Sequence, residues 1–209
     1  MYNMKRRNFI FDIFSIGLMS SITSKLKANN FNFSPMVRSI STWKTTEANF
    51  KAGLMLDKGA DALEAAVIGV AVEEENPKNT TVGFGGAPDR TGKVTLDACV
   101  MNHLGDCGSV VAVENIVNVA KLAKDVMEKT PHVMLAGKGA EEFALSQGYE
   151  KINLLTETSK KEWEKWLENE EYKPLINIEN HDTIGMLCLD KNNNMSGAGT
   201  TRGLAYKMK

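Results

Sequence analysis

The sequence predicts a mixed fold in which strands and helices alternate, of either the α/β or the α+β class. Apolar residues recur at helical spacing in 57–74 and in 116–127. Short runs rich in strand-forming residues occupy 94–101 and 184–189. The run Asn192-Asn193-Asn194 then separates two strand-like segments, and asparagine tolerates the positive φ of a hairpin turn. Interleaving of the two element types is what indicates a mixed fold.

The elements are expected in a simple order along the chain. Proline and glycine set several of the boundaries, because proline disfavours helix in the preceding residue and glycine ends helices. The expected elements are a strand at 37–43, a helix at 57–74, strands at 94–101 and 109–113, a helix at 116–127 that ends before Pro131, a short helix at 139–147 ended by Gly148, a helical piece with Trp163 and Trp166, and strands at 184–189 and 195–200.

The composition is that of one soluble globular domain. The 209 residues are 43% hydrophobic and 24% charged, with a net charge of −1. This near-neutral charge argues against nucleic-acid binding, which needs a basic face. No run of 18 apolar residues occurs, so no transmembrane helix is expected, and we expect no membrane contact of the mature form.

The first 30 residues read as an export signal. Lys5, Arg6 and Arg7 form a basic region before a mostly apolar stretch at 9–22. The two arginines followed by an apolar pair resemble the bacterial twin-arginine signal, which predicts a periplasmic protein. An amphipathic or disordered tail is the alternative interpretation of the same residues.

Most other conspicuous residues favour structural roles. The glycine-rich loop at 83–86 lacks the lysine and spacing of a phosphate-binding loop and reads as a tight turn. The three histidines are far apart in sequence and no C-x-x-C motif occurs, which argues against a zinc site. Cys99 and Cys107 could meet across a loop, and their pairing stays open, whereas Cys188 reads as a buried thiol.

The string Asn180-His181-Asp182-Thr183-Ile184-Gly185-Met186 carries the functional signal. It resembles the autocleavage site of glycosylasparaginases, which are type 2 asparaginases of the N-terminal nucleophile hydrolase superfamily. The resemblance extends over about residues 37 to 209. Its other parts are Ser41-Thr42-Trp43, the loop and strand at 82–98, the segments at 126–135 and 142–148, Tyr172-Lys173-Pro174, and the segments at 196–201 and 203–207.

This resemblance implies an α+β fold, the four-layer αββα sandwich of the superfamily, and self-cleavage between Asp182 and Thr183. Residues 31–182 would form the α-chain and residues 183–209 the start of the β-chain. The Thr183 hydroxyl would attack the Asp182 carbonyl carbon, with the Asp182 carboxylate as a base and with support from His181. By position, Thr201 would support the nucleophile, and Trp43 would border the substrate pocket.

The chemistry suits the residue types. A freed Thr183 would own a hydroxyl and an α-amine with a pKa of roughly 7.7–8.0, so one residue supplies nucleophile and base. The substrate implied is a small molecule, a glycosylated asparagine or a β-aspartyl compound, and no metal or organic cofactor is needed. The resemblance also implies an α/β heterodimer cut from one precursor, and dimers of that unit.

Several features depart from the family pattern. Lys44-Thr45-Thr46 stands where relatives carry an aromatic residue and glycine, and Arg202 stands where they carry a small residue. The part from Thr183 to Lys209 lacks the later charged clamp and oxyanion donors, and losing one such donor costs about 10²–10³ in rate. The sequence therefore predicts a fold truncated after the first β-chain hairpin, and an incomplete, inactive chain.

Two alternatives remain at this stage. One is an isoaspartyl peptidase or plant-type asparaginase of the same superfamily, although those usually have glycine before the nucleophile, and Asp182 together with Trp43 favours the glycosylasparaginase. The other is a non-catalytic remnant without enzymatic function.

Overall fold

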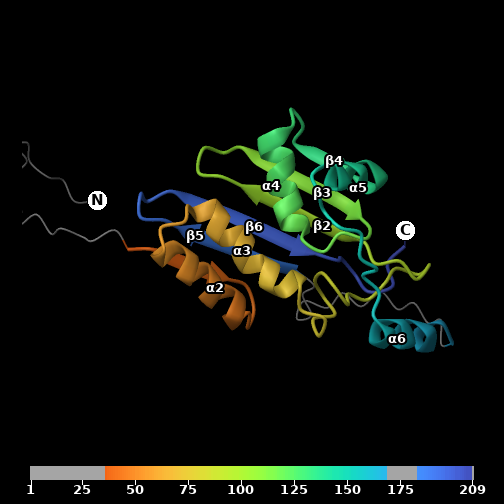
Figure 1. Cartoon of the computed structure of the whole chain (residues 1–209). Helices are drawn as coiled ribbons and strands as arrows, with labels where there is room; N and C mark the ends of the chain where they lie inside the picture. Colours follow the sequence, from red (N-terminus) through yellow and green to blue (C-terminus); the bar gives the residue numbers. More distant parts are fainter. Residues whose placement is uncertain (1–35, 169–182, 209) are drawn as a thin grey trace, which may run out of the picture. The chain divides into compact units, whose positions relative to one another are not determined.

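A six-stranded sheet organises the part of the chain that this computed structural model describes, residues 36–168 and 183–208 (Figure 1). Pro35 to Lys209 form one compact unit. All neighbouring strands are antiparallel except the last pair, β3 and β4, which are parallel. In spatial order the strands are β1 (Arg38–Ser41), β5 (Thr183–Leu189), β6 (Met195–Thr201), β2 (Leu96–Met101), β3 (Cys107–Val113) and β4 (Met134–Ala136).

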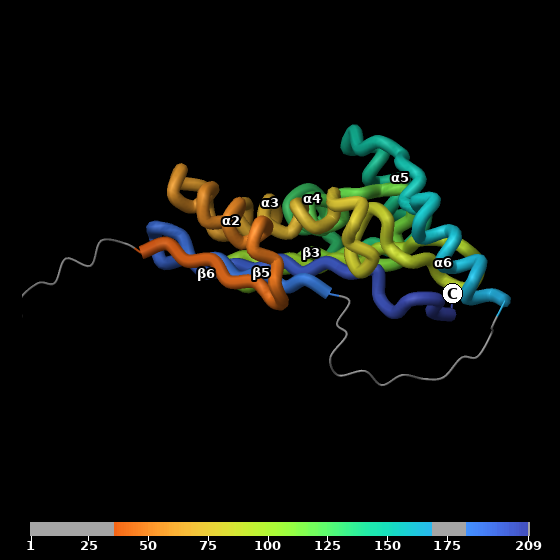
Figure 2. The backbone as a smooth tube through the Cα atoms, turned by 90° about the horizontal axis from the view of Figure 1, so that it is seen from below, coloured from red at the N-terminus to blue at the C-terminus, as the bar shows by residue number. Residues whose placement is uncertain are grey.

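Helices cover one face of this sheet. Figure 2 shows α2 (Thr46–Asp57), α3 (Ala62–Glu74) and α4 (Val119–Lys129) on the same side of the strands. Helix α3 packs on β5 and β6, whereas α4 packs on β2 and β3. Two further helices, α5 (Gly137–Ser146) and α6 (Glu157–Glu168), follow α4 in the chain. The mixed α and β composition predicted from the sequence is confirmed.

The core lies between the sheet and these helices. Alternate residues of β5, Ile184, Met186 and Cys188, are buried toward the helices. Helix α3 presents small buried residues to the sheet, and a Cβ on its Gly69 would come within 2.3 Å of the Met186 sulfur. Small side chains therefore let α3 approach the strands closely.

The other face of the sheet is apolar and open within the described residues. Ile40, Met101, Leu187 and Met195 are each more than half exposed. Together with neighbouring strand residues they border a broad groove of about 840 Å³. Exposed apolar surface of this extent on one sheet face is typical of a surface that packs against another layer.

The sequence misplaced one helix boundary and missed one helix. The helix expected at 57–74 begins only at Ala62, because the chain turns at Gly59, whose φ is 95°. Asp61 then caps α3, and its carboxylate accepts a hydrogen bond of 2.9 Å from the Glu64 N–H. Helix α2 was missed because its buried face consists of only three residues, Ala48, Ala52 and Leu56.

The other predicted elements are confirmed with shifts of a few residues at their ends. The first strand stops at Ser41 instead of residue 43, and the turn that follows brings Trp43 into the left-handed region. The hairpin between β5 and β6 turns at Asn193, which has a φ of 60° as expected for asparagine at such a turn.

The glycine-rich loop is a tight turn, as predicted. Gly83 has a φ of 64°, and a Cβ on it would lie 2.1 Å from the Glu74 carbonyl oxygen. The neighbouring Phe84 N–H donates to that same oxygen over 2.8 Å. Only glycine permits this contact, so the loop fastens the end of α3 instead of presenting its amides to a ligand.

Residues 36–168 and 183–208 contain neither a cluster of metal ligands nor a membrane-spanning helix. His103 and His132 border one cavity of about 650 Å³, but no three metal-ligating side chains in these ranges converge. No helix in the same ranges is long and apolar enough to cross a bilayer. Cys99, Cys107 and Cys188 are free thiols, and Cys188 is buried as predicted. The predicted export signal lies outside the described residues.

We expect Gly108→Ala to destabilise the fold strongly. A Cβ at this position in β3 would lie 2.2 Å from the Ala123 carbonyl oxygen of α4, so the helix must move away from the sheet. Overpacking of this kind costs about 1–3 kcal/mol, measured as the free energy of unfolding in urea. Gly139→Ala in α5 is the matched control, because its Cβ would meet nothing within 4 Å, and it should be neutral or stabilising. If both variants change the free energy of unfolding equally, the close contact between Gly108 and α4 does not determine stability.

Candidate active site

Thr183 and Thr201 lie opposite each other in the sheet. Thr183 opens β5 and Thr201 closes β6, and the two are direct partners in the antiparallel register. Their neighbours Ile184 and Thr200 are buried toward the helices, so the two threonines share the opposite, open face. The Thr201 Oγ1 accepts a hydrogen bond of 3.0 Å from the Gly203 N–H, which fixes its rotamer. The structure therefore brings together two residues that the sequence singled out.

The turn after β1 holds the backbone of Thr183. The Trp43 indole N–H donates to the Thr183 carbonyl oxygen over 2.8 Å. The Thr42 hydroxyl accepts from the Gly185 N–H over 3.0 Å and lies 3.4 Å from the same Thr183 oxygen. Trp43 has a φ of 60°, and its side chain is half exposed. Both residues thus anchor the first residues of β5, a role for which the sequence gave no signal at Thr42.

A small polar cavity of about 240 Å³ borders Thr183 and Trp43. Its polar wall includes a hydrogen-bonded chain in which the Thr81 hydroxyl donates to Asn79 and the Asn79 amide donates to Glu73. These contacts are 2.8 Å each. The sequence analysis missed this chain, although Asn79 and Thr81 directly precede the glycine-rich loop that it did single out.

Lys44 and Arg202, which depart from the family pattern, differ in their relation to this cavity. Lys44 borders it, so the cavity carries a cation at its edge. Arg202 is almost fully buried, and its guanidinium donates to the carbonyl oxygens of Thr80 and Gly203. Arg202 does not border the cavity, so its size does not obstruct the space beside Thr183.

A buried carboxyl group lies behind the threonine pair, on the helix side. Glu74 is fully buried, and the Ala120 N–H donates to its Oε1 over 3.0 Å. The pKa of Glu74 is raised from 4.5 to about 7, chiefly by burial and to a smaller extent by the charge of Glu75. The Thr200 hydroxyl and the N–H groups of Ala120 and Val119 lower it in part. Glu74 is therefore a carboxyl that titrates near neutral pH.

Two further site residues predicted from the sequence precede Thr183 in the chain. His181 and Asp182, which would flank and form the cleavage bond, lie outside the described residues. The described chain resumes at Thr183, whose backbone is already in the sheet.

Comparison with known proteins shows the family to which the chain belongs. The family model described as asparaginase matches residues 28–209, so the chain belongs to the type 2 asparaginase family, as the sequence predicted.

Individual relatives are glycosylasparaginases by name. The chain is 54% identical over 187 residues to the N(4)-(β-N-acetylglucosaminyl)-L-asparaginase of Elizabethkingia miricola, covering 89% of this chain and 54% of that protein. It is 32% identical over 205 residues to the rat protein of the same name, covering 83% and 59%. The mouse protein gives 32% over 207 residues, covering 84% and 60%. The chain thus spans somewhat more than half the length of these relatives.

We expect Thr42→Val to loosen the start of β5. The isosteric change leaves the Gly185 N–H without its 3.0 Å acceptor, at a cost of about 1 kcal/mol in the free energy of unfolding. Thr95→Val is the control, because no hydrogen bond of the Thr95 hydroxyl is found among the described residues. Urea unfolding of the two variants should separate them, and identical midpoints would contradict an anchoring role for Thr42.

The raised pKa of Glu74 predicts how stability varies with pH. The folded chain holds the Glu74 proton more tightly than the unfolded chain, so stability is highest below about pH 4.5 and is lost as the pH rises through about 7. The full loss is on the order of 3 kcal/mol. Glu74→Gln should remove this pH-dependent loss in urea unfolding, whereas Glu75→Gln should keep it. If the free energy of unfolding changes with pH in the same way in wild type and in Glu74→Gln, the raised pKa of Glu74 is contradicted.

Proposed function

We propose that this protein is a self-cleaving N(4)-(β-N-acetylglucosaminyl)-L-asparaginase with Thr183 as its nucleophile. The observation that carries the proposal is the direct pairing of Thr183 with Thr201, beside a cavity bordered by Trp43. Support also comes from the family assignment and from the names of the relatives. These relatives favour this activity over an isoaspartyl peptidase.

In the first step, the Thr183 hydroxyl attacks the Asp182 carbonyl carbon. An N-to-O acyl shift converts the peptide bond into an ester on Thr183, and water then hydrolyses that ester. The Asp182 carboxylate serves as base and His181 supports it. The Trp43 indole, which holds the Thr183 carbonyl oxygen at 2.8 Å, keeps the attacking residue in place while the bond before it breaks.

In the second step, the freed Thr183 acts on substrate. Its α-amine takes the hydroxyl proton and the hydroxyl attacks the side-chain amide carbon of a glycosylated asparagine. The amine product leaves, and water hydrolyses the β-aspartyl ester. Thr201, opposite Thr183 in the register, hydrogen-bonds the nucleophile, and Trp43 contacts the substrate. The resulting α- and β-chains stay together through the sheet, since β1 pairs with β5 across the cleavage point.

The uncovered sheet face supports the four-layer fold of this superfamily. Ile40, Met101, Leu187 and Met195 present an apolar surface on the side away from the helices. In a sandwich of two sheets, a second sheet and its helices bury this surface, which at about 25 cal/mol per Å² stabilises the assembly substantially. The export signal at residues 1–30 belongs to the same proposal, with the mature enzyme in the periplasm.

Thr183→Ala is the decisive variant. We expect the full-length wild-type protein to yield two chains by intact mass, one of them beginning at Thr183, and we expect Thr183→Ala to stay uncut. Ser146→Ala, which removes an exposed hydroxyl on α5, should cleave as wild type does. Cleaved wild type should release amine from a glycosylated asparagine faster than from a β-aspartyl dipeptide. An uncut wild type, or cleavage elsewhere, would refute the proposal.

A further inference from the structure

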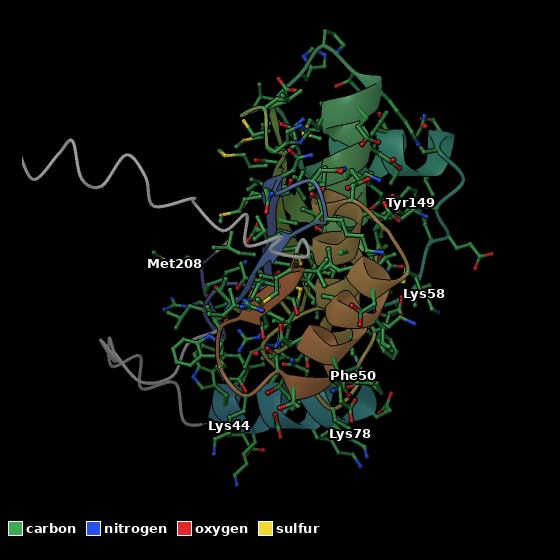
Figure 3. All side chains as sticks on the ribbon, turned by 90° about the vertical axis from the view of Figure 1, so that its left-hand side faces the viewer. Lys44, Phe50, Lys58, Lys78, Tyr149 and Met208 are labelled. Atoms are coloured by element: carbon green, nitrogen blue, oxygen red, sulfur yellow. The ribbon has the colours of Figure 1, made fainter. Side chains whose placement is uncertain are left out.

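A second cavity lies at the end of the sheet away from Thr183. Figure 1 shows the β5–β6 and β2–β3 hairpins at this end, and Figure 3 views the molecule from the same side. The cavity has a volume of about 650 Å³, which lies within the range of small-molecule sites. Thr183 opens β5 and Asp190 directly follows it, so a strand length of roughly 20 Å separates this cavity from the threonine pair. The cavity is therefore distinct from the candidate active site.

Carboxyl groups dominate the charge around this cavity. They come from four separate segments, namely the turn before α3, the β2–β3 hairpin, the end of α4 and the β5–β6 hairpin. The residues that carry them are Asp61, Asp106, Glu128 and Asp190. His103 and His132 also border the cavity, whereas no lysine or arginine of the described residues does. Among the described residues, only Glu128 of the four acids lies within ion-pair distance of a lysine, 3.8 Å from Lys124.

The two helix ends at the cavity agree with this negative character. The last turn of α4 borders it through Met127 and Glu128, and the C-terminal end of a helix carries partial negative charge. The N-terminal end of α3 also borders it and carries partial positive charge. However, the Asp61 carboxylate accepts from the Glu64 N–H over 2.9 Å and offsets that charge. The surroundings of the cavity therefore favour a cation over an anion.

The two most buried polar side chains at the cavity have unused hydrogen-bonding capacity. Asp190 is 2% exposed and Ser196 is 5% exposed. The Asp190 Oδ1 accepts from the N–H groups of Asn192 and Asn194, over 2.8 and 3.0 Å, which holds the hairpin turn. Its Oδ2 is buried without a partner among the described residues, where the Ser196 hydroxyl makes no hydrogen bond either. An unpaired buried carboxyl oxygen is unfavourable, so we expect a donor from outside the chain.

The strand pattern directs both side chains toward the cavity. Side chains alternate along a strand, and Cys188 and Ala198 are buried beneath the helices. Asp190 and Ser196 each lie two residues from one of these, so they face the same side of the sheet. The start of α3 and the last turn of α4 border the cavity on that side. The free Asp190 oxygen and the Ser196 hydroxyl therefore lie at the inner end of the cavity.

The spacing of the acidic groups indicates the class of cation. No three metal-ligating side chains within residues 36–168 and 183–208 converge, so the carboxyl groups are spread around the cavity. Groups spread in this way suit a flexible molecule with several ammonium groups, each of which donates charge-assisted hydrogen bonds. We propose that this cavity binds a small organic polyamine. One ammonium group donates to Asp190 Oδ2 and the Ser196 hydroxyl, and the others lie near Asp106 and Glu128.

Isothermal titration calorimetry with spermidine tests this proposal in the full-length protein. We expect saturable binding of one spermidine per chain that weakens as the salt concentration rises. Asp190→Asn should raise the Kd about tenfold, because it removes the charge at the inner end of the cavity. Asparagine keeps an oxygen acceptor for the two turn amides, so the hairpin should still form. Glu47→Gln is the matched control, because it removes an exposed carboxyl group of α2 that does not border the cavity, and the Kd should stay unchanged.

A second measurement locates the bound molecule without any variant. In NMR spectra of the full-length protein, spermidine should shift the amide signals of residues 102–107 and of Ser196. The signals of Thr183 and Thr201 should not shift, because these residues lie at the other end of β5 and β6. A neutral diol of the same chain length should cause no shift, since it lacks the ammonium groups.

The proposal is overturned if spermidine shows no saturable binding, or if Asp190→Asn and Glu47→Gln weaken binding equally, which would indicate diffuse attraction alone. It is also overturned if magnesium ions at the same concentration of charge displace spermidine, which would indicate an unspecific cation site. Should Asp190→Asn fail to fold, Asp106→Asn on the exposed hairpin replaces it, with an expected rise in Kd of about threefold. None of these results depends on self-cleavage, so they stand or fall separately from the proposed function.

Discussion

The antiparallel pairing of β5 with β6 fixes the position of each candidate catalytic group that the structure describes. Its register sets Thr183 opposite Thr201 and Ile184 opposite Thr200. Because side chains alternate along a strand, the same register sends the threonine pair to the open face and Thr200 to the helix face. A slip of one residue would exchange these faces and separate Thr183 from Thr201. The buried side chains of Ile184 and Met186 oppose such a slip, since they would become exposed.

Close packing of α3 on this pair of strands brings the helix end to the site. Gly69 lets α3 approach Met186, and Gly83 lets the next loop pass against the carbonyl of Glu74. Larger residues at either position would push the helix end away from β6. Because Gly69 and Gly83 have no side chain, the carboxyl group of Glu74 can lie close to β6, on the helix side of the sheet.

The hairpin and the position of Thr183 at the start of a strand could be predicted from sequence, because asparagine turns and the string around Thr183 are local signals. Glu74 could not, since it lies in a run of three glutamates that reads as a solvated helix end, and only the packing of α4 shows which one is buried. Thr42 was missed for a similar reason. Its hydroxyl acts on Gly185, a residue far away in the chain, and such a contact leaves no pattern in either segment.

Trp43 shows how the site uses an unfavourable backbone conformation. A left-handed residue other than glycine costs roughly 1–2 kcal/mol, and Trp43 adopts one with a φ of 60°. This conformation ends β1 and swings the indole over the start of β5, where its N–H reaches the Thr183 carbonyl oxygen. An extended Trp43 would continue β1 alongside β5, opposite Ile184, and would lose that contact. The hydrogen bond to Thr183 stabilises this conformation by about 1 kcal/mol. The pairing of β1 with β5 must offset the remaining strain energy of Trp43. The backbone of Thr183 is thus fixed by the sheet and by the turn after β1.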